Sequence, residues 1–177
     1  MNTKPMKRIQ WMILAVGLSY CTTPTTPSDH SKHLASEQSK SSEKRHNASD
    51  FLILMDYMKI KDALVASDSE KVSKLSKTFL NDLKNEINPP SVALSEAADS
   101  LLNALDLDMQ RQAFKSVTEV ITQWIKASNT QETLFVQFCP MAFKGQGATW
   151  LSLTEEIINP YFGTLMLNCG HIDEKIN

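Results

Sequence analysis

Residues 134–152, LFVQFCPMAFKGQGATWLS, and residues 157–170, IINPYFGTLMLNCG, differ in character from the rest of this 177-residue chain. Between Leu134 and Gly170 lie two of the three cysteines and four of the five glycines. Leu134–Phe138 is rich in residues typical of strands, and Pro140 ends the run because proline lacks a backbone donor. The segment therefore predicts a small β-containing module.

Turns divide this module. Gly145 and Gly147 permit a tight turn before Ala148–Leu151, since glycine tolerates backbone angles that other residues avoid. Asn159-Pro160 and Gly163 indicate another turn, followed by the short apolar run 165–167. We expect two or three short strands or loops. Their contact with the rest of the protein would be filled by aromatic side chains: Phe143, Trp150, Tyr161 and Phe162.

The sulfur atoms of this module are candidate metal ligands. Cys139 and Met141 are spaced i, i+2, which places two side chains on one face of an extended strand. Met166 and Cys169 form a second sulfur pair. Converging thiolates and thioethers suit a soft ion such as Cu(I) or Ag(I). His171 is a further candidate ligand that can replace a methionine.

A disulfide is the alternative use of the same cysteines. Cysteine pairs in oxidising compartments commonly form disulfides. Joining Cys139 to Cys169 would close a loop of about 30 residues and stabilise the module by about 3 kcal/mol on the chain-entropy model. The spacing of the cysteines alone does not distinguish metal binding from a disulfide. A disulfide, however, gives no reason for a methionine close to each cysteine.

Four amphipathic helices precede the module. The first begins at Asp50, after Ser49 as a plausible N-cap, and the second opens with the capping-box pattern 67–70 and stops at Pro89-Pro90. The third opens at Ser91; the fourth opens at Asp106 or Asp108 and ends near Ser128-Asn129. Apolar residues recur at helical spacing in each, for example Ile53, Tyr57, Ile60 and Leu64 in the first and Val72, Leu75, Phe79, Leu83 and Ile87 in the second. We predict a mainly α fold, an antiparallel four-helix bundle with a small C-terminal β/loop module.

The N-terminus has the pattern of an export signal. A basic segment is followed by the apolar run 9–18, which is shorter than the ~20 residues that span a bilayer. Leu18-Ser19-Tyr20-Cys21 resembles a lipobox, in which Cys21 is lipidated, although Tyr20 departs from the small residue usual there. This interpretation divides the chain into a signal peptide (1–20), a disordered tether (21–49) and a folded domain (50–174), anchored to a membrane by lipid.

The net charge and the absence of known catalytic motifs argue against nucleic-acid binding and enzymatic activity. Of 18 basic residues, Lys4, Lys7 and Arg8 lie in the signal, which leaves 15 basic against 20 acidic residues, a net charge near −5. We therefore expect no nucleic-acid binding. The sequence contains no Cys-x-x-Cys, no nucleophile elbow, no His-Glu-x-x-His and no phosphate-binding glycine loop, so we expect no enzymatic activity.

The C-terminal motif also resembles a known family. This part of the chain closely resembles the bacterial domain of unknown function DUF3347 in two motifs: CPMAF with the later GA-x-WLS, and I-x-NPYFG followed by M and CG. The resemblance extends over about residues 50–174. In that family the domain occurs in stand-alone exported lipoproteins and at the C-terminus of periplasmic adaptor subunits of copper/silver efflux pumps. The resemblance implies a role in heavy-metal handling in the cell envelope, with such an adaptor as partner.

Overall fold

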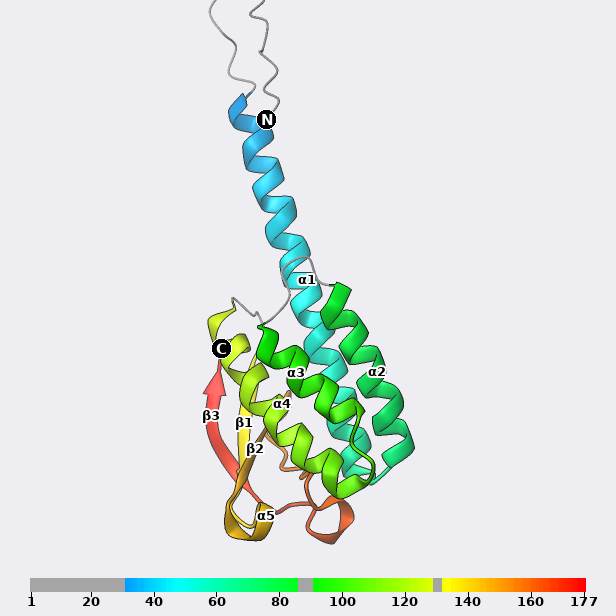
Figure 1. Cartoon of the computed structure of the whole chain (residues 1–177). Helices are drawn as coiled ribbons and strands as arrows, with labels where there is room; N and C mark the ends of the chain where they lie inside the picture. The colour runs from blue at the N-terminus through cyan, green and yellow to red at the C-terminus, as the bar shows by residue number, and fades with distance from the viewer. Residues whose placement is uncertain (1–30, 86–90, 129–131) are drawn as a thin grey trace, which may run out of the picture.

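The fold is mainly helical, with a small antiparallel sheet at the C-terminal end (Figure 1). The computed structural model describes residues 31–85, 91–128 and 132–177, and for residues 31–47 it describes the backbone alone. Cys21, the signal peptide 1–20 and the first part of the expected tether lie outside the described residues. The mainly α fold class and the small C-terminal β module are confirmed.

Helix α1, Ser31–Val65, buries the expected stripe, since Ile53, Tyr57, Ile60 and Leu64 are all buried. The expected start of this helix at Asp50 is wrong, because α1 begins at Ser31 and passes through Asp50 without a break. The segment 31–49 contains Lys, Glu, Gln and Ala and lacks Pro and Gly, so nothing in it stops a helix. In Figure 1 the first part of α1 projects well beyond the body of the protein.

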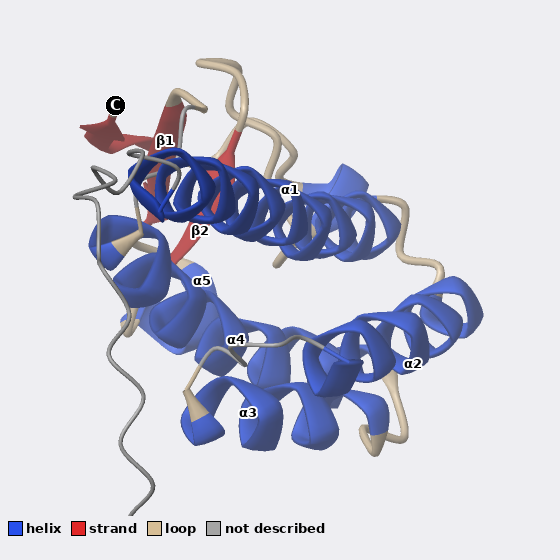
Figure 2. Ribbon diagram, turned by 90° about the horizontal axis from the view of Figure 1, so that it is seen from above, coloured by secondary structure: helices blue, strands red, loops and turns tan. Residues whose placement is uncertain are grey.

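The next three helices are α2 (Ser69–Asn85), α3 (Val92–Leu102) and α4 (Leu107–Ala127). The Asp106 side chain accepts a hydrogen bond from the Met109 backbone N–H, which fixes Asp106 as the N-cap of α4. Helix α2 packs against α1 and α3, and α3 packs against α4. Figure 2 shows α2 at one side of these helices and the strands at the other. Pro89-Pro90 lie outside the described residues, and the up-and-down antiparallel order of a bundle stays a prediction.

The sheet has the order β2-β1-β3, with both outer strands antiparallel to the central one. The strands are β1 (Leu134–Cys139), β2 (Ala148–Ser152) and β3 (His171–Ile176), and the short helix α5 (Ala142–Gly145) links β1 to β2. The apolar run 165–167 is not a strand: it begins at the last residue of the 3₁₀ helix η1 (Gly163–Leu165) and continues into a turn. Strand β3 was not predicted, because half of its residues are charged and all but Ile176 are exposed.

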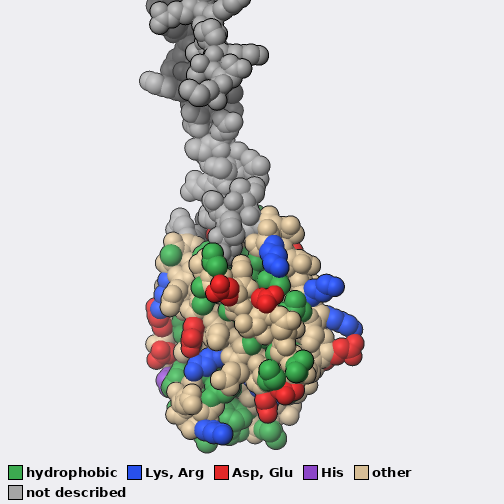
Figure 3. Space-filling model, in the orientation of Figure 1, with side chains coloured by type: hydrophobic (Ala, Val, Ile, Leu, Met, Phe, Trp, Pro, Cys, Tyr) green, Lys and Arg blue, Asp and Glu red, His purple; other side chains and the backbone are tan. Residues whose placement is uncertain are grey.

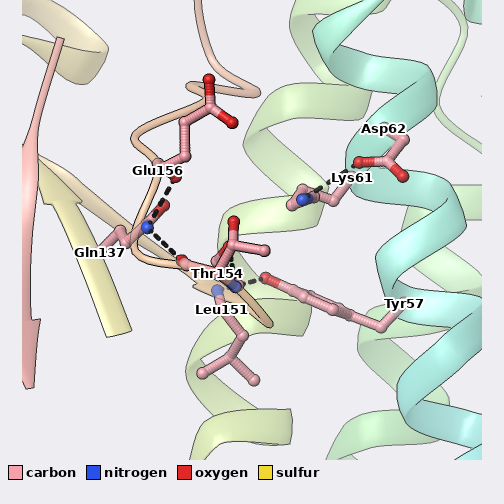
Figure 4. A network of polar contacts seen from close by, with 8 residues as sticks. Tyr57, Lys61, Asp62, Gln137, Leu151, Thr154 and Glu156 are labelled. Carbon is pink, nitrogen blue, oxygen red and sulfur yellow. Dashed lines mark hydrogen bonds and ion pairs between the residues drawn. The ribbon is translucent and has the colours of Figure 1, made fainter. Parts of the chain in front are cut away.

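Tyr57 joins the helices to the sheet (Figure 4). Its hydroxyl oxygen lies 2.8 Å from Thr118 Oγ1 on α4 and accepts a hydrogen bond from the Leu151 backbone N–H on β2 at 3.0 Å. The Tyr57 ring stacks on Phe114, with ring centroids 4.9 Å apart. Helix α4 also packs directly on β2. The sheet is therefore fixed to α1 and α4, and the ends of its strands are held in place.

Within the described ranges, no helix combines the length and the apolar character that crossing a bilayer requires.

Candidate sulfur site

The two C-terminal cysteines meet at one end of the sheet. Cys139 is the last residue of β1, and Cys169 lies two residues before β3. Because Phe138 pairs with His171 across the two strands, the residues flanking this pair are brought together. The Sγ atoms of Cys139 and Cys169 are 3.0 Å apart, and both residues are free cysteines. The two thiols, which come from segments 30 residues apart in the chain, therefore lie in contact.

The backbone of Cys169 is held by a buried asparagine. The Asn159 side-chain amide donates to the Cys169 carbonyl at 2.8 Å, and the Asn159 backbone N–H donates to the Leu167 carbonyl at 2.7 Å. A further hydrogen bond from the Cys169 N–H to the Met166 carbonyl, at 3.1 Å, closes the turn between them. The sequence analysis treated Asn159 only as a turn residue; the Asn-Pro pair signals the turn but not the burial.

Gly170 allows the chain to pass close to the sheet directly after Cys169. Its φ is +146°, and a Cβ at this position would lie 2.8 Å from the Phe138 carbonyl oxygen and 2.9 Å from the Trp150 ring. Side chains larger than hydrogen are therefore excluded on both steric and backbone grounds. Trp150 and Tyr161, expected as packing residues, are buried beside this point with their rings in edge contact.

The distance between the two sulfur atoms can be compared with the distances that a metal ion and a disulfide require. With a metal–sulfur bond of about 2.3 Å, two thiolates on one ion at a tetrahedral angle lie about 3.8 Å apart. A disulfide bond is about 2.0 Å long. The observed 3.0 Å lies between the two. The pair can close into a disulfide by moving inward, or hold a soft ion by moving apart by a similar amount.

The methionines are arranged differently from the cysteines. Strand β1 ends at Cys139, and Met141 has helical backbone angles in the following turn, so the shared strand face expected for Cys139 and Met141 does not form. Pro140 is the physical reason, because it ends the ladder before Met141. Met141 is 56% exposed. Met166 is partly buried in the turn that leads to Cys169.

His171 lies on the exposed side of the same end of the sheet. It is the first residue of β3, and its ring meets the edge of Phe138 with centroids 5.7 Å apart. Across the described part of the chain, no cluster of three or more His, Cys, Asp and Glu side chains is placed to hold a metal ion. A soft-metal site here would therefore depend on the two thiols and on the thioethers of Met141 and Met166.

The hydrogen bond between the thiols changes their acidity. It raises the pKa of Cys169 above its ordinary value, and partial burial and the nearby charge of Cys139 add to the effect. The Cys169 thiolate, which is the nucleophile and the metal ligand, is thus less populated at neutral pH than in a free cysteine.

Removing the neighbouring thiol should therefore make Cys169 more reactive. In reduced chain carrying Cys21→Ser, we expect Cys139→Ala to speed the alkylation of Cys169 by iodoacetamide at pH 8, because its pKa falls toward the ordinary value and more thiolate is present. Rates measured from pH 6 to 10 should show the midpoint of reactivity at lower pH in the variant. An unchanged midpoint would contradict the role of the hydrogen bond.

Comparison with known proteins gives one match. The family model described as Protein of unknown function (DUF3347) matches residues 53–133. No curated protein and no solved structure matches this chain. The matched range begins inside α1 and ends at the residue before β1, so it covers the second part of α1 and all of α2, α3 and α4. The C-terminal motif that carries the sequence resemblance lies beyond it.

Proposed function

We propose that this chain is a lipoprotein of the cell envelope, facing the periplasm, that binds Cu(I) or Ag(I) and is an accessory to metal efflux or homeostasis. The observation that carries the proposal is the convergence of Cys139 and Cys169 from separate segments to 3.0 Å. Two thiolates prefer soft monovalent ions, and the thioethers of Met141 and Met166, which are close to the two cysteines in the sequence, are the proposed additional ligands. The protein would buffer the ion or pass it to the periplasmic adaptor subunit of an efflux pump.

The arrangement of the domain is consistent with a tethered carrier. The sulfur pair lies where β1 ends and β3 begins, and α5 follows directly after β1 (Figure 1). The first part of α1 projects from the opposite end of the body. With Cys21 lipidated and residues 21–49 as the tether, a bundle anchored through α1 would present its sulfur end away from the membrane. Labelled palmitate that is incorporated equally into Cys21→Ser would contradict the lipid anchor.

Titration of reduced chain carrying Cys21→Ser with Cu(I), against a competing chelator, tests the metal proposal. We expect one ion per chain, and affinity at least about tenfold weaker (about 1.4 kcal/mol) in Cys139→Ser and in Cys169→Ser. Met166→Ala and Met141→Ala should each weaken binding less, because a thioether is the weaker donor. Met109→Ala, on the exposed surface of α4, is the matched control. Cu(I) affinity that is the same in both cysteine variants as in the parent would end the metal proposal.

A second candidate function is favoured by the shortness of the sulfur contact. At 3.0 Å the thiols are closer than two ligands of one ion are expected to be. In this alternative, Cys139 and Cys169 form a disulfide that staples an envelope protein-interaction domain without metal. A count of free thiols on protein recovered from the envelope without reductant separates the two: two free thiols favour the metal carrier, and none favours the staple.

A further inference from the structure

The two sulfur atoms differ in their access to solvent. Cys139 is 0% exposed and belongs to the main core, whereas Cys169 is partly exposed. Its chain neighbours Asn168 and His171 are exposed. A reagent approaching from solvent therefore meets Cys169 and not Cys139. The site has one open side.

We propose that the Cys139–Cys169 disulfide is an exchange site for a protein dithiol, which attacks at Cys169 alone. In the first step the partner thiolate bonds to the Cys169 sulfur, the Cys139–Cys169 bond breaks, and Cys139 leaves as a thiolate that takes up a proton. In the second step the other thiol of the partner loses its proton and attacks the partner's own sulfur, which releases Cys169. Two electrons pass to this chain, and the partner becomes a disulfide.

The geometry gives this direction because exchange needs the incoming sulfur in line with the bond that breaks. With Cys139 as the leaving group, the incoming thiolate approaches Cys169, the partly exposed residue of the pair. With Cys169 as the leaving group, it would have to approach Cys139, which is 0% exposed and pairs with the buried Ala148. The second approach is blocked by the core.

The contacts of Asn159 and Gly170 keep the two cysteines positioned to form the disulfide again. Asn159 fixes the Cys169 carbonyl, and Gly170 lies against Phe138 and Trp150, so releasing the sulfurs does not by itself free the backbone. The surroundings suit a protein partner: Met141 is 56% exposed and Leu165 is 84% exposed, one close to each cysteine in the chain. Figure 3 shows hydrophobic side chains at this end of the molecule. Exposed apolar side chains of this kind fit the apolar surface of a dithiol protein.

This inference does not rest on metal binding, because it concerns the oxidised chain and the metal proposal concerns the reduced one. The probe is a thioredoxin-type protein whose second active-site cysteine is replaced by serine, so that the mixed disulfide cannot resolve. It is mixed with the oxidised full chain carrying Cys21→Ser, and the trapped complex is digested and mapped by mass spectrometry. We expect the probe on Cys169 at least about tenfold more often than on Cys139. Equal labelling, or no trapped complex, would overturn the proposal.

Single-cysteine chains give a second measurement that does not need the disulfide. Cys139→Ser leaves Cys169, and Cys169→Ser leaves Cys139; both carry Cys21→Ser. An aromatic disulfide reagent should react at least about tenfold faster with Cys169 than with Cys139 in the folded chains, and at similar rates in urea. Similar rates in the folded chains would overturn the assignment of Cys169 as the attacked sulfur. Similar rates in urea together with a tenfold difference in the folded chains would attribute the selectivity to the fold.

Discussion

Trp150→Ala is expected to lower the free energy of unfolding by about 3–5 kcal/mol, because it removes a large aromatic side chain from the core and leaves a cavity. Trp150 is 0% exposed on β2, opposite Gln137 of β1. Its ring meets the edge of Tyr161 and lies against the position of Gly170, the residue after Cys169. The cavity would therefore open beneath the sulfur site. Urea unfolding should show a lower midpoint, with the melting temperature lower by about 10 °C.

Two other substitutions test whether the loss of stability comes from the burial of Trp150 and not from the removal of a tryptophan as such. Trp124→Ala, on the less buried face of α4, should cost much less than Trp150→Ala. Trp150→Phe should cost at most about 2 kcal/mol, since it keeps the aromatic contact and deletes an indole N–H that is buried without a hydrogen-bond partner in the described structure. Equal losses of unfolding free energy in Trp124→Ala and Trp150→Ala would show that Trp150 does not hold the sheet to the loop between β2 and β3, which contains Tyr161 and Gly170.

The helices could be predicted well because their signals are local. Apolar residues at helical spacing become buried stripes on α1 and α2, and Asp106 caps α4 as one of the two residues expected to do so. The start of α1 could not be predicted in the same way. The sequence of residues 31–49 contains no apolar stripe at helical spacing, so its composition favours disorder while its helix propensity favours continuation of the helix. A helix start at Asp50 gives too much weight to composition, because α1 begins at Ser31.

The sheet and the site depend on contacts between distant residues, which spacing does not give. The sequence analysis pairs Cys139 with Cys169 as metal ligands or as a disulfide, but the register that brings them together pairs β1 with β3, a strand whose residues are exposed except Ile176. The position of Met141 was predicted wrongly because the i, i+2 rule was carried past Pro140. Tyr57 was predicted only as a core residue, since nothing local distinguishes a tyrosine whose hydroxyl links three elements from one that only fills space.

Gly163→Ala is expected to destabilise the domain by about 2–5 kcal/mol through backbone strain and steric overlap together. Gly163 has φ +56°, and a Cβ there would lie 2.8 Å from the Val65 carbonyl oxygen and 2.7 Å from Ser67 Oγ. A backbone carbonyl at the end of α1 cannot move aside as a flexible side chain can. The added methyl group must therefore separate the loop from the turn between α1 and α2.

Gly145→Ala is the matched control, because Gly145 also has a positive φ but no atom lies close to the position of an added Cβ. Its φ is +84°, and a Cβ there would meet no atom within 4 Å. It should cost only about 1 kcal/mol, the strain contribution alone. The difference in free energy of unfolding between the two variants, measured in urea, thus isolates the steric contribution at Gly163. Equal losses would mean that the loop does not approach α1 this closely.

The close approach at Gly163 also governs the loop that leads to Cys169. Arg111 on α4 holds this region by donating from Nε to the Pro160 carbonyl and from Nη2 to Ser67 Oγ, and the Cβ of an alanine at 163 would lie 3.2 Å from Nη2. Moving the loop outward would break the hydrogen bond to Pro160 of a guanidinium whose pKa is already lowered by burial. Gly163→Ala should therefore slow disulfide formation between Cys139 and Cys169, whereas Gly145→Ala should not. Loss of stability without slower disulfide formation would show that Asn159 and Gly170 alone position Cys169.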